Sequence, residues 1–249
     1  MRSIIVSRKK VSVLDVAINI ITMNDAIDVI IDDFLKSDKI HLIATANAEM
    51  VMMASKDKEL QEILNSADLV VPDGAGVVWA SNKLGYPMKE RVAGYDLVQH
   101  LLNKLKNGKE SFYFLGSSPG VAEKAKVYAE TKYPGVNIVG THDGYFSVEE
   151  EKMVVQEIQK LRPDILLVAL GVPRQEKWIK KHFDELNVPV TIGVGGTLDV
   201  MAGVVKRAPL WMQKAKLEWL YRGMLQPKRI CRLIALPKFV IKVLQDKKY

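Results

Sequence analysis

Residues 165–176 read Ile165-Leu166-Leu167-Val168-Ala169-Leu170-Gly171-Val172-Pro173-Arg174-Gln175-Glu176 and indicate an α/β fold. Ile165 to Ala169 form a short, uninterrupted apolar run, which is typical of a strand buried on both faces of a parallel sheet. A glycine turn follows this run. The residues from Pro173 then open a helix, because proline is favoured in a first turn.

The same alternation of short β-branched runs and longer amphipathic stretches extends over residues 11–194. It predicts a Rossmann-like, largely parallel sheet flanked by helices. Asn24 or Asp25 is a candidate cap for a helix over 26–35, and Ser118-Pro119 precedes one over 121–133. Ser147 and Glu150 predict a capping box for a helix that ends near Leu161. The predicted strands are Val16 to Ile21, His41 to Thr45, Leu69 to Val71, Ser111 to Leu115, Val136 to Val139, Ile165 to Ala169 and Val190 to Val194.

Composition excludes several classes of protein. With 48% hydrophobic and 26% charged residues over 249 positions, the chain is not a disordered polymer. A single cysteine, Cys231, can form neither an internal disulfide nor a cysteine-rich zinc site, and a reducing cytoplasmic setting fits best. No apolar run approaches the roughly 20 residues that span a bilayer. We therefore expect any membrane contact to be peripheral.

The formal charge of +7 is unevenly distributed. Residues 203–249 contain twelve Lys or Arg against Glu218 and Asp246, a net +10, which leaves −3 for residues 1–202. This asymmetry predicts a catalytic α/β body over 1–202 and a basic helical appendage over 203–249. Helical spacing of apolar residues extends from Leu210 to Met224, and a second helix is predicted over 228–245, with Pro237 as a break or kink. Cationic amphipathic helices of this kind can lie on an anionic membrane surface.

Standard cofactor and metal signatures are incomplete. Trp79 and Leu198 occupy the place of the third glycine in two partial GxGxxG motifs, and no P-loop motif is present. There is no Asp-x-Asp pair, and the four histidines lack the spacing of metal ligands. We therefore predict neither a metal nor another cofactor.

Polar residues stand where the predicted strands end, which is where open parallel sheets bind ligands. Each has two interpretations. Asp73 can act as a general base or cap a helix, and Arg91 can bind a phosphate or remain a surface charge. Thr45 and Asn47 can orient sugar hydroxyls or stabilise turns. The remaining candidates are the Gln175 amide and the turns at Gly116, Gly195 and Gly196, whose glycines bring backbone amides to an anion or only permit tight geometry.

Taken together, these loops resemble the WecG/TagA/CpsF family of bacterial glycosyltransferases, and the TagA branch most closely. The matching text covers nearly the whole chain in order: Thr45-Ala46-Asn47, Pro72-Asp73-Gly74-Ala75-Gly76, Glu90-Arg91-Val92-Ala93-Gly94-Tyr95-Asp96, Phe114-Leu115-Gly116, Gly144-Tyr145-Phe146, Leu170 to Trp178, Gly193-Val194-Gly195-Gly196, Arg207-Ala208-Pro209 and Leu217 to Arg222.

The resemblance implies an inverting transfer of N-acetylmannosamine from its UDP donor to the 4-hydroxyl of N-acetylglucosamine on undecaprenyl diphosphate. In the TagA branch this disaccharide links wall teichoic acid. The resemblance assigns the base to Asp73 and places Thr45, Asn47, Arg91 and Gln175 around the substrates. It also indicates Arg222, Arg229 and Arg232 as appendage residues that contact a diphosphate.

Other interpretations stay open at this stage. The family also fits another UDP sugar, such as the uronic acid of N-acetylmannosamine, and self-association is not determined. A nicotinamide oxidoreductase is disfavoured by the missing glycine fingerprint. A nucleic-acid-binding protein would use the +10 segment on phosphates. Against that class, Trp211, Trp219 and Tyr221 stand among Leu and Met at helical spacing, as membrane-facing or core residues would.

Overall fold

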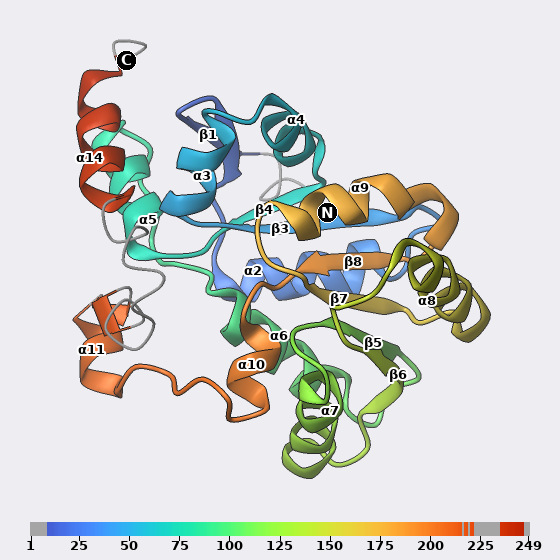
Figure 1. Ribbon diagram of the computed structural model, residues 1–249. Helices are drawn as coiled ribbons and strands as arrows, with labels where there is room; N and C mark the ends of the chain where they lie inside the picture. Colours follow the sequence, from blue (N-terminus) through green and yellow to red (C-terminus); the bar gives the residue numbers. More distant parts are fainter. Residues whose placement is uncertain (1–8, 216, 219, 222–234, 247–249) are drawn as a thin grey trace.

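The chain forms a parallel sheet covered by helices on both faces (Figure 1). The computed structural model describes residues 9–215, 217, 218, 220, 221 and 235–246. The six sheet strands lie in the order β4-β3-β8-β7-β5-β6, and every neighbouring pair is parallel. Their bounds are β3 His41–Ala46, β4 Leu69–Pro72, β5 Ser111–Gly116, β6 Asn137–His142, β7 Ile165–Ala169 and β8 Val190–Gly193. The predicted α/β fold is confirmed.

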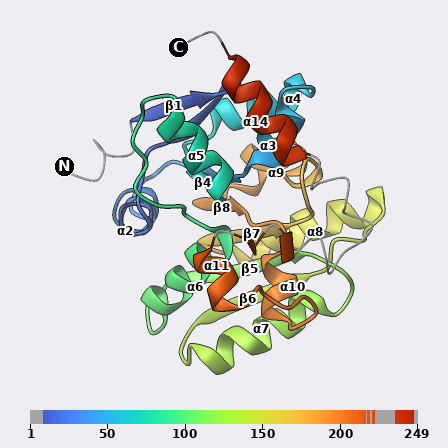
Figure 2. The same ribbon diagram turned by 90° about the vertical axis from the view of Figure 1, so that its left-hand side faces the viewer.

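Helices pack on the sheet as two layers (Figures 1 and 2). One layer contains α3 Ala48–Ala54, α4 Lys58–Ser66, α8 Val148–Leu161 and α9 Arg174–Leu186. The other contains α2 Met23–Asp28, α6 Gly94–Leu105, α7 Val121–Lys132 and α10 Thr197–Met201. Successive strand residues alternate between the two hydrophobic cores, as the two-residue period of a strand requires: Leu166 and Val168 enter one core, and Ile165 and Leu167 the other.

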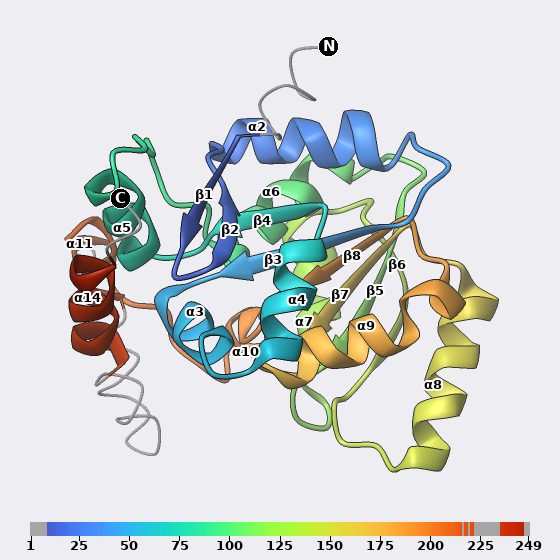
Figure 3. The ribbon, with the colours of Figure 1, turned by 90° about the horizontal axis from the view of Figure 1, so that it is seen from above.

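Three helices gather at one end of the molecule (Figures 1 and 3). They are α5 Ala75–Lys83, α11 Leu210–Lys214 and α14 Ala235–Gln245. Phe239 and Val243 of α14 are buried against the body, so the C-terminal helix is packed on it. None of the described helices is long and apolar enough to cross a membrane.

The N-terminal strand differs from the prediction. Val16–Asn19 forms β2, which pairs with β1, Lys10–Val13, as an antiparallel hairpin outside the six-stranded sheet. Its turn, Leu14-Asp15, has φ of 49° and 66°, the geometry of a tight two-residue hairpin turn. The predicted run Val16 to Ile21 was therefore correct as a strand and wrong as part of the main sheet.

The helix ends confirm part of the prediction and correct part of it. The capping box at Ser147 and Glu150 is confirmed, and α8 ends at Leu161 as expected. The first helix is capped by Thr22 rather than Asn24 or Asp25, and Asp25 instead completes the capping box. It continues as the π-helix η1, Val29–Phe34. Pro237 neither breaks nor ends α14, because it stands in the first turn, where its missing N–H costs no helical bond.

The segment predicted as helical from Leu210 to Met224 is divided in the structure, where residues 218, 220 and 221 are helical beyond the end of α11. The helix α11 ends at Lys214, and Met224 lies outside the described residues, as does 228–234 of the second predicted helix.

Candidate active site

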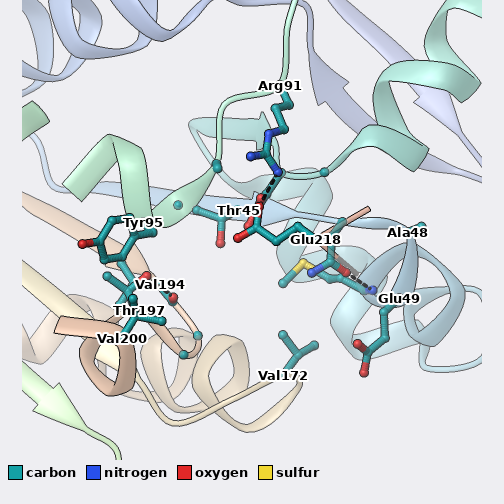
Figure 4. A pocket seen from close by; sticks show the side chains of 18 of the residues that line it. Thr45, Ala48, Glu49, Arg91, Tyr95, Val172, Val194, Thr197, Val200 and Glu218 are labelled. Atoms are coloured by element: carbon teal, nitrogen blue, oxygen red, sulfur yellow. Dashed lines mark hydrogen bonds and ion pairs between the residues drawn. The ribbon is translucent and has the colours of Figure 1, made fainter. Parts of the chain in front are cut away.

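A cavity of about 310 Å³ opens at the carboxyl ends of β3, β4, β7 and β8. Loops that follow these strands supply most of its wall, and the loop before α6 and the C-terminal segment supply the rest (Figure 4). This is where a parallel sheet presents its loops to a ligand. Seven of the predicted site residues meet here: Thr45, Asn47, Asp73, Arg91, Gln175, Gly195 and Gly196.

The residues after β3 are held by local hydrogen bonds. The Thr45 hydroxyl is buried and donates to the carbonyl of Gly193 at 2.8 Å, which ties the end of β3 to the end of β8. Asn47 caps α3, because its side-chain oxygen accepts from the backbone N–H of Met50 at 2.9 Å. The capping interpretation of Asn47 is thus correct, and the residue also lines the cavity.

Asp73 directly follows β4. Its backbone N–H donates to the carbonyl of Ala46 at 2.8 Å, which fixes it beside the end of β3. Gly74 then turns the chain into α5 with φ of +117°, a conformation that L side chains rarely adopt. The Asp73 side chain is partly exposed at the cavity wall. A carboxylate at such a place can accept a proton from a hydroxyl that comes within hydrogen-bond reach.

Gln175 connects α9 to the glycine turn after β8. It is 1% exposed, and its side-chain oxygen accepts from the backbone N–H of Gly195 at 3.0 Å. Its Nε2 donates to Oε1 of the buried Glu176 at 2.6 Å. The N–H of Gly195 therefore already donates to Gln175, and this hydrogen bond holds the turn.

Glu176 is a buried carboxyl beside this turn. Burial raises its pKa to about 7, and the hydrogen bond from Gln175 acts in the opposite direction. Its second oxygen, Oε2, is buried and makes no hydrogen bond within the described part of the chain. The carboxyl is thus a proton-binding group next to the cavity wall.

Arg91 reaches the cavity from the loop before α6 and meets a carboxylate there. Its Nη1 lies 2.8 Å from Oε2 of Glu218 (Figure 4). The other oxygen of Glu218, Oε1, faces Nε of Arg207 at 3.4 Å. Arg207 also forms a two-pronged pair with Asp96 at 2.6 and 2.7 Å. The strand-end pattern points to none of Glu218, Arg207 and the cavity-lining Tyr95 as site residues, although all three stand in the motifs quoted above.

Gly116 lies away from the cavity lining. It ends β5 with φ of +126°, and a Cβ atom at this position would come within 2.5 Å of the backbone of Ala169. The close approach of two neighbouring strands therefore accounts for this glycine. The predicted diphosphate contacts Arg222, Arg229 and Arg232 lie outside the described residues.

No group of three His, Cys, Asp or Glu residues suited to a metal ion occurs in the described portion of the chain. Arg91 and Arg207 line the cavity and are cations that can bind an anionic ligand.

Comparisons with known proteins agree with this geometry. Residues 11–249 match the family described as the glycosyl transferase WecG/TagA/CpsF family. Curated relatives named N-acetylglucosaminyldiphosphoundecaprenol N-acetyl-beta-D-mannosaminyltransferase are similar over most of the chain. The protein from Bacillus subtilis strain 168 is 37% identical over 83% of this chain and 80% of its own length. The protein from Staphylococcus aureus strain MRSA252 is 35% identical over 96% of this chain and 94% of its own. The chain therefore belongs to the WecG/TagA/CpsF family of glycosyltransferases.

Proposed function

We propose that this enzyme moves N-acetylmannosamine from UDP-N-acetylmannosamine to the 4-hydroxyl of N-acetylglucosamine on undecaprenyl diphosphate, with inversion at the anomeric carbon. One observation carries the proposal. Residues from five separate loops, Asp73, Arg91 and Gln175 among them, meet in one cavity of a chain that matches relatives named for this acceptor and sugar.

Asp73 is the proposed base. Its carboxylate takes the proton of the acceptor 4-hydroxyl while that oxygen forms a bond to the anomeric carbon. The bond from the anomeric carbon to the donor phosphate oxygen breaks at the same time, and the electron pair leaves with UDP. The placement of Asp73 at the cavity wall, next to the end of β3, supports this role.

Arg91 is the proposed contact for the leaving diphosphate. A guanidinium near the developing negative charge stabilises the transition state without a metal ion. The cavity position of Arg91 supports this assignment. Thr45 and Asn47 lie on the wall contributed by β3 and α3, where they would orient the sugars. Gln175 and the turn at Gly195 and Gly196 would shape the part of the wall that follows β7 and β8.

The appendage, residues 203–249, is proposed to hold the enzyme on the inner face of the cell membrane, where the lipid-linked acceptor resides. Exposed apolar side chains on α11 and α14 support this role: Leu210 is 73% exposed, Trp211 66% and Leu244 57%. Lys238 and Lys242 on α14 add positive charge to the same end of the molecule (Figure 3). Apolar and cationic side chains together favour binding to anionic lipid.

The test is UDP release from UDP-N-acetylmannosamine with a lipid-linked N-acetylglucosamine acceptor, in the presence of chelator. We expect the wild-type enzyme to release UDP. The rate should fall by about 100-fold or more in Asp73→Asn, as for removal of a general base. Asp184→Asn, at an exposed position of α9, is the matched control and should retain activity. Parallel reactions with UDP-N-acetylglucosamine and UDP-N-acetylmannosaminuronic acid test the donor. Full activity in Asp73→Asn would remove Asp73 as the base, and a preference for another donor would replace the proposed sugar.

A further inference from the structure

A carboxylate from the appendage lies between the two arginines that line the described part of the cavity. Glu218 is 7% exposed, and its two oxygens face different partners. Oε2 accepts from Nη1 of Arg91 at 2.8 Å (Figure 4), and Oε1 accepts from Nε of Arg207 at 3.4 Å. One side chain thus joins the loop before α6, the linker after α10 and residues 217–221.

Arg207 is held in place by other groups. Its guanidinium forms a two-pronged pair with the carboxylate of Asp96 and lies 4.7 Å from the ring centroid of Tyr95. Both partners stand in the first turn of α6. A planar guanidinium held along one edge and on one face has little freedom to move. Arg207, itself near the start of the appendage, is therefore fixed to α6 of the body and offers Glu218 a docking point there.

Charge makes this contact specific. The appendage carries twelve Lys or Arg and two acids, Glu218 and Asp246. A buried carboxylate is unfavourable unless cations and hydrogen bonds compensate for its lost hydration. Glu218 finds both at the same point, between Arg91 and Arg207. The appendage is consequently most stable in the position that lets this carboxylate reach both arginines.

Arg91 gains orientation from the same contact. An arginine side chain has several rotatable bonds, and an ion pair that fixes its guanidinium reduces the entropy lost when a ligand binds. Glu218 accepts from Nη1, and a guanidinium carries five N–H donors in all. The same group can therefore be held by Glu218 and still bind a phosphate oxygen.

We propose that Glu218 is a positioning residue that docks its part of the appendage on the α6-bound Arg207 and holds Arg91 toward the donor diphosphate. The part of this proposal that concerns catalysis rests on the proposed function, in which Arg91 contacts the diphosphate. The part that concerns docking rests on the Glu218 contacts alone. The two parts have separate measurements.

Glu218→Gln tests both parts, because it keeps the shape of the side chain and removes its charge. We expect kcat/KM for the UDP donor, measured on vesicles with lipid-linked acceptor, to fall by about tenfold or more, as for loss of a transition-state contact. We expect trypsin to cleave residues 203–221 several-fold faster at about the same thermal midpoint of the body, because proteolysis reports the population of the open state. Glu149→Gln, an exposed glutamate on α8, is the matched control and should change neither quantity.

A double variant distinguishes positioning from general destabilisation. If Arg207 and Glu218 act as one unit, Arg207→Gln/Glu218→Gln should lose no more kcat/KM than the worse single variant, and additive losses would contradict this. Wild-type kinetics and trypsin rates in Glu218→Gln would overturn the proposal. Tighter UDP binding with faster turnover would also overturn it, because Glu218 would then compete with the diphosphate. If the wild-type chain transferred no sugar, the proposed function would fail, and the trypsin measurement would still decide whether Glu218 docks the appendage.

Discussion

The side-chain oxygen of Gln175 accepts a hydrogen bond of 3.0 Å from the backbone N–H of Gly195, which joins the start of α9 to the turn after β8. The orientation of the amide is determined by its partners. A backbone N–H can only donate, and the Glu176 oxygen at 2.6 Å from Nε2 accepts. The glycine turn that lines the cavity is thus fixed by a buried side chain of the neighbouring helix.

Gln175→Leu should disturb this turn. The substitution removes the acceptor for the Gly195 N–H, and an unsatisfied buried donor costs about 1–3 kcal/mol of stability. We expect lower transfer activity, measured by UDP release, and a free energy of unfolding that is lower by that amount, measured by urea unfolding. Gln156→Leu, at an exposed position of α8, is the control. Equal stability of the two variants would show that the hydrogen bond does not hold the turn.

Glu176→Gln should change how stability depends on pH. Burial raises the pKa of the folded-state carboxyl to about 7, from about 4.5 when unfolded. The Glu176 carboxyl therefore makes its full contribution to the free energy of unfolding below about pH 4.5, and this contribution is lost as the pH rises through 7. Above that pH the buried charge costs up to about 3 kcal/mol, from 1.36 kcal/mol for each pKa unit.

The amide cannot ionise, so Glu176→Gln should match wild type near pH 4.5 and exceed it in stability at pH 8. Urea unfolding at both pH values measures the difference. Glu62→Gln, an exposed residue of α4, should show no such pH-dependent gain. A stability difference that stays constant with pH would contradict the titration of Glu176 in this range.

Gly116→Ala should destabilise the sheet rather than weaken binding directly. The backbone has φ of +126°, and the new Cβ would meet Ala169 backbone atoms at 2.5 Å. We expect a loss of about 2–4 kcal/mol, in the range of strained backbone and overpacked sites. The matched control is Gly120→Ala, because Gly120 has φ of +78° and nothing within 4 Å of a Cβ. Thermal unfolding of both variants separates steric overlap from backbone conformation. Equal losses would exclude overlap with Ala169 as the cause.

The sequence predicted where strands and helix caps lie better than it predicted which strands pair. Ile165 to Ala169 was identifiable as a strand because an uninterrupted apolar run of that length suits a buried parallel strand. Val16 to Ile21 was also identifiable as a strand, but periodicity does not tell which strand it pairs with, and it joined a hairpin. Local caps were predictable at Ser147, where both partners stand within three residues.

Long-range ion pairs in the candidate site could not be predicted in this way. Arg91 and Glu218 are 127 positions apart, and no local pattern relates their charges. Their pairing depends on how the C-terminal segment crosses the carboxyl end of the sheet. The cavity residues of the strand-end loops were predictable because a parallel sheet gathers those loops at one edge.

Leu210→Ser/Trp211→Ser should weaken binding to anionic vesicles. Both side chains are highly exposed on α11, at the end of the molecule that also carries α14 (Figures 1 and 3). Burying two large apolar side chains in the lipid interface contributes about 1.5–3 kcal/mol each when burial is complete. We therefore expect at least about a tenfold loss of affinity for vesicles that contain phosphatidylglycerol, measured by cosedimentation.

Met153→Ser is the matched control for the vesicle experiment. Met153 is 61% exposed on α8, at the other end of the molecule from α11 and α14, so its loss should leave vesicle binding unchanged. Binding of the wild-type chain should also weaken as salt increases, because salt screens the attraction between lysines and anionic headgroups. If the α11 variant kept wild-type affinity while Met153→Ser lost it, the membrane-facing surface would lie at α8, and the appendage would have to act without direct contact between α11 and lipid.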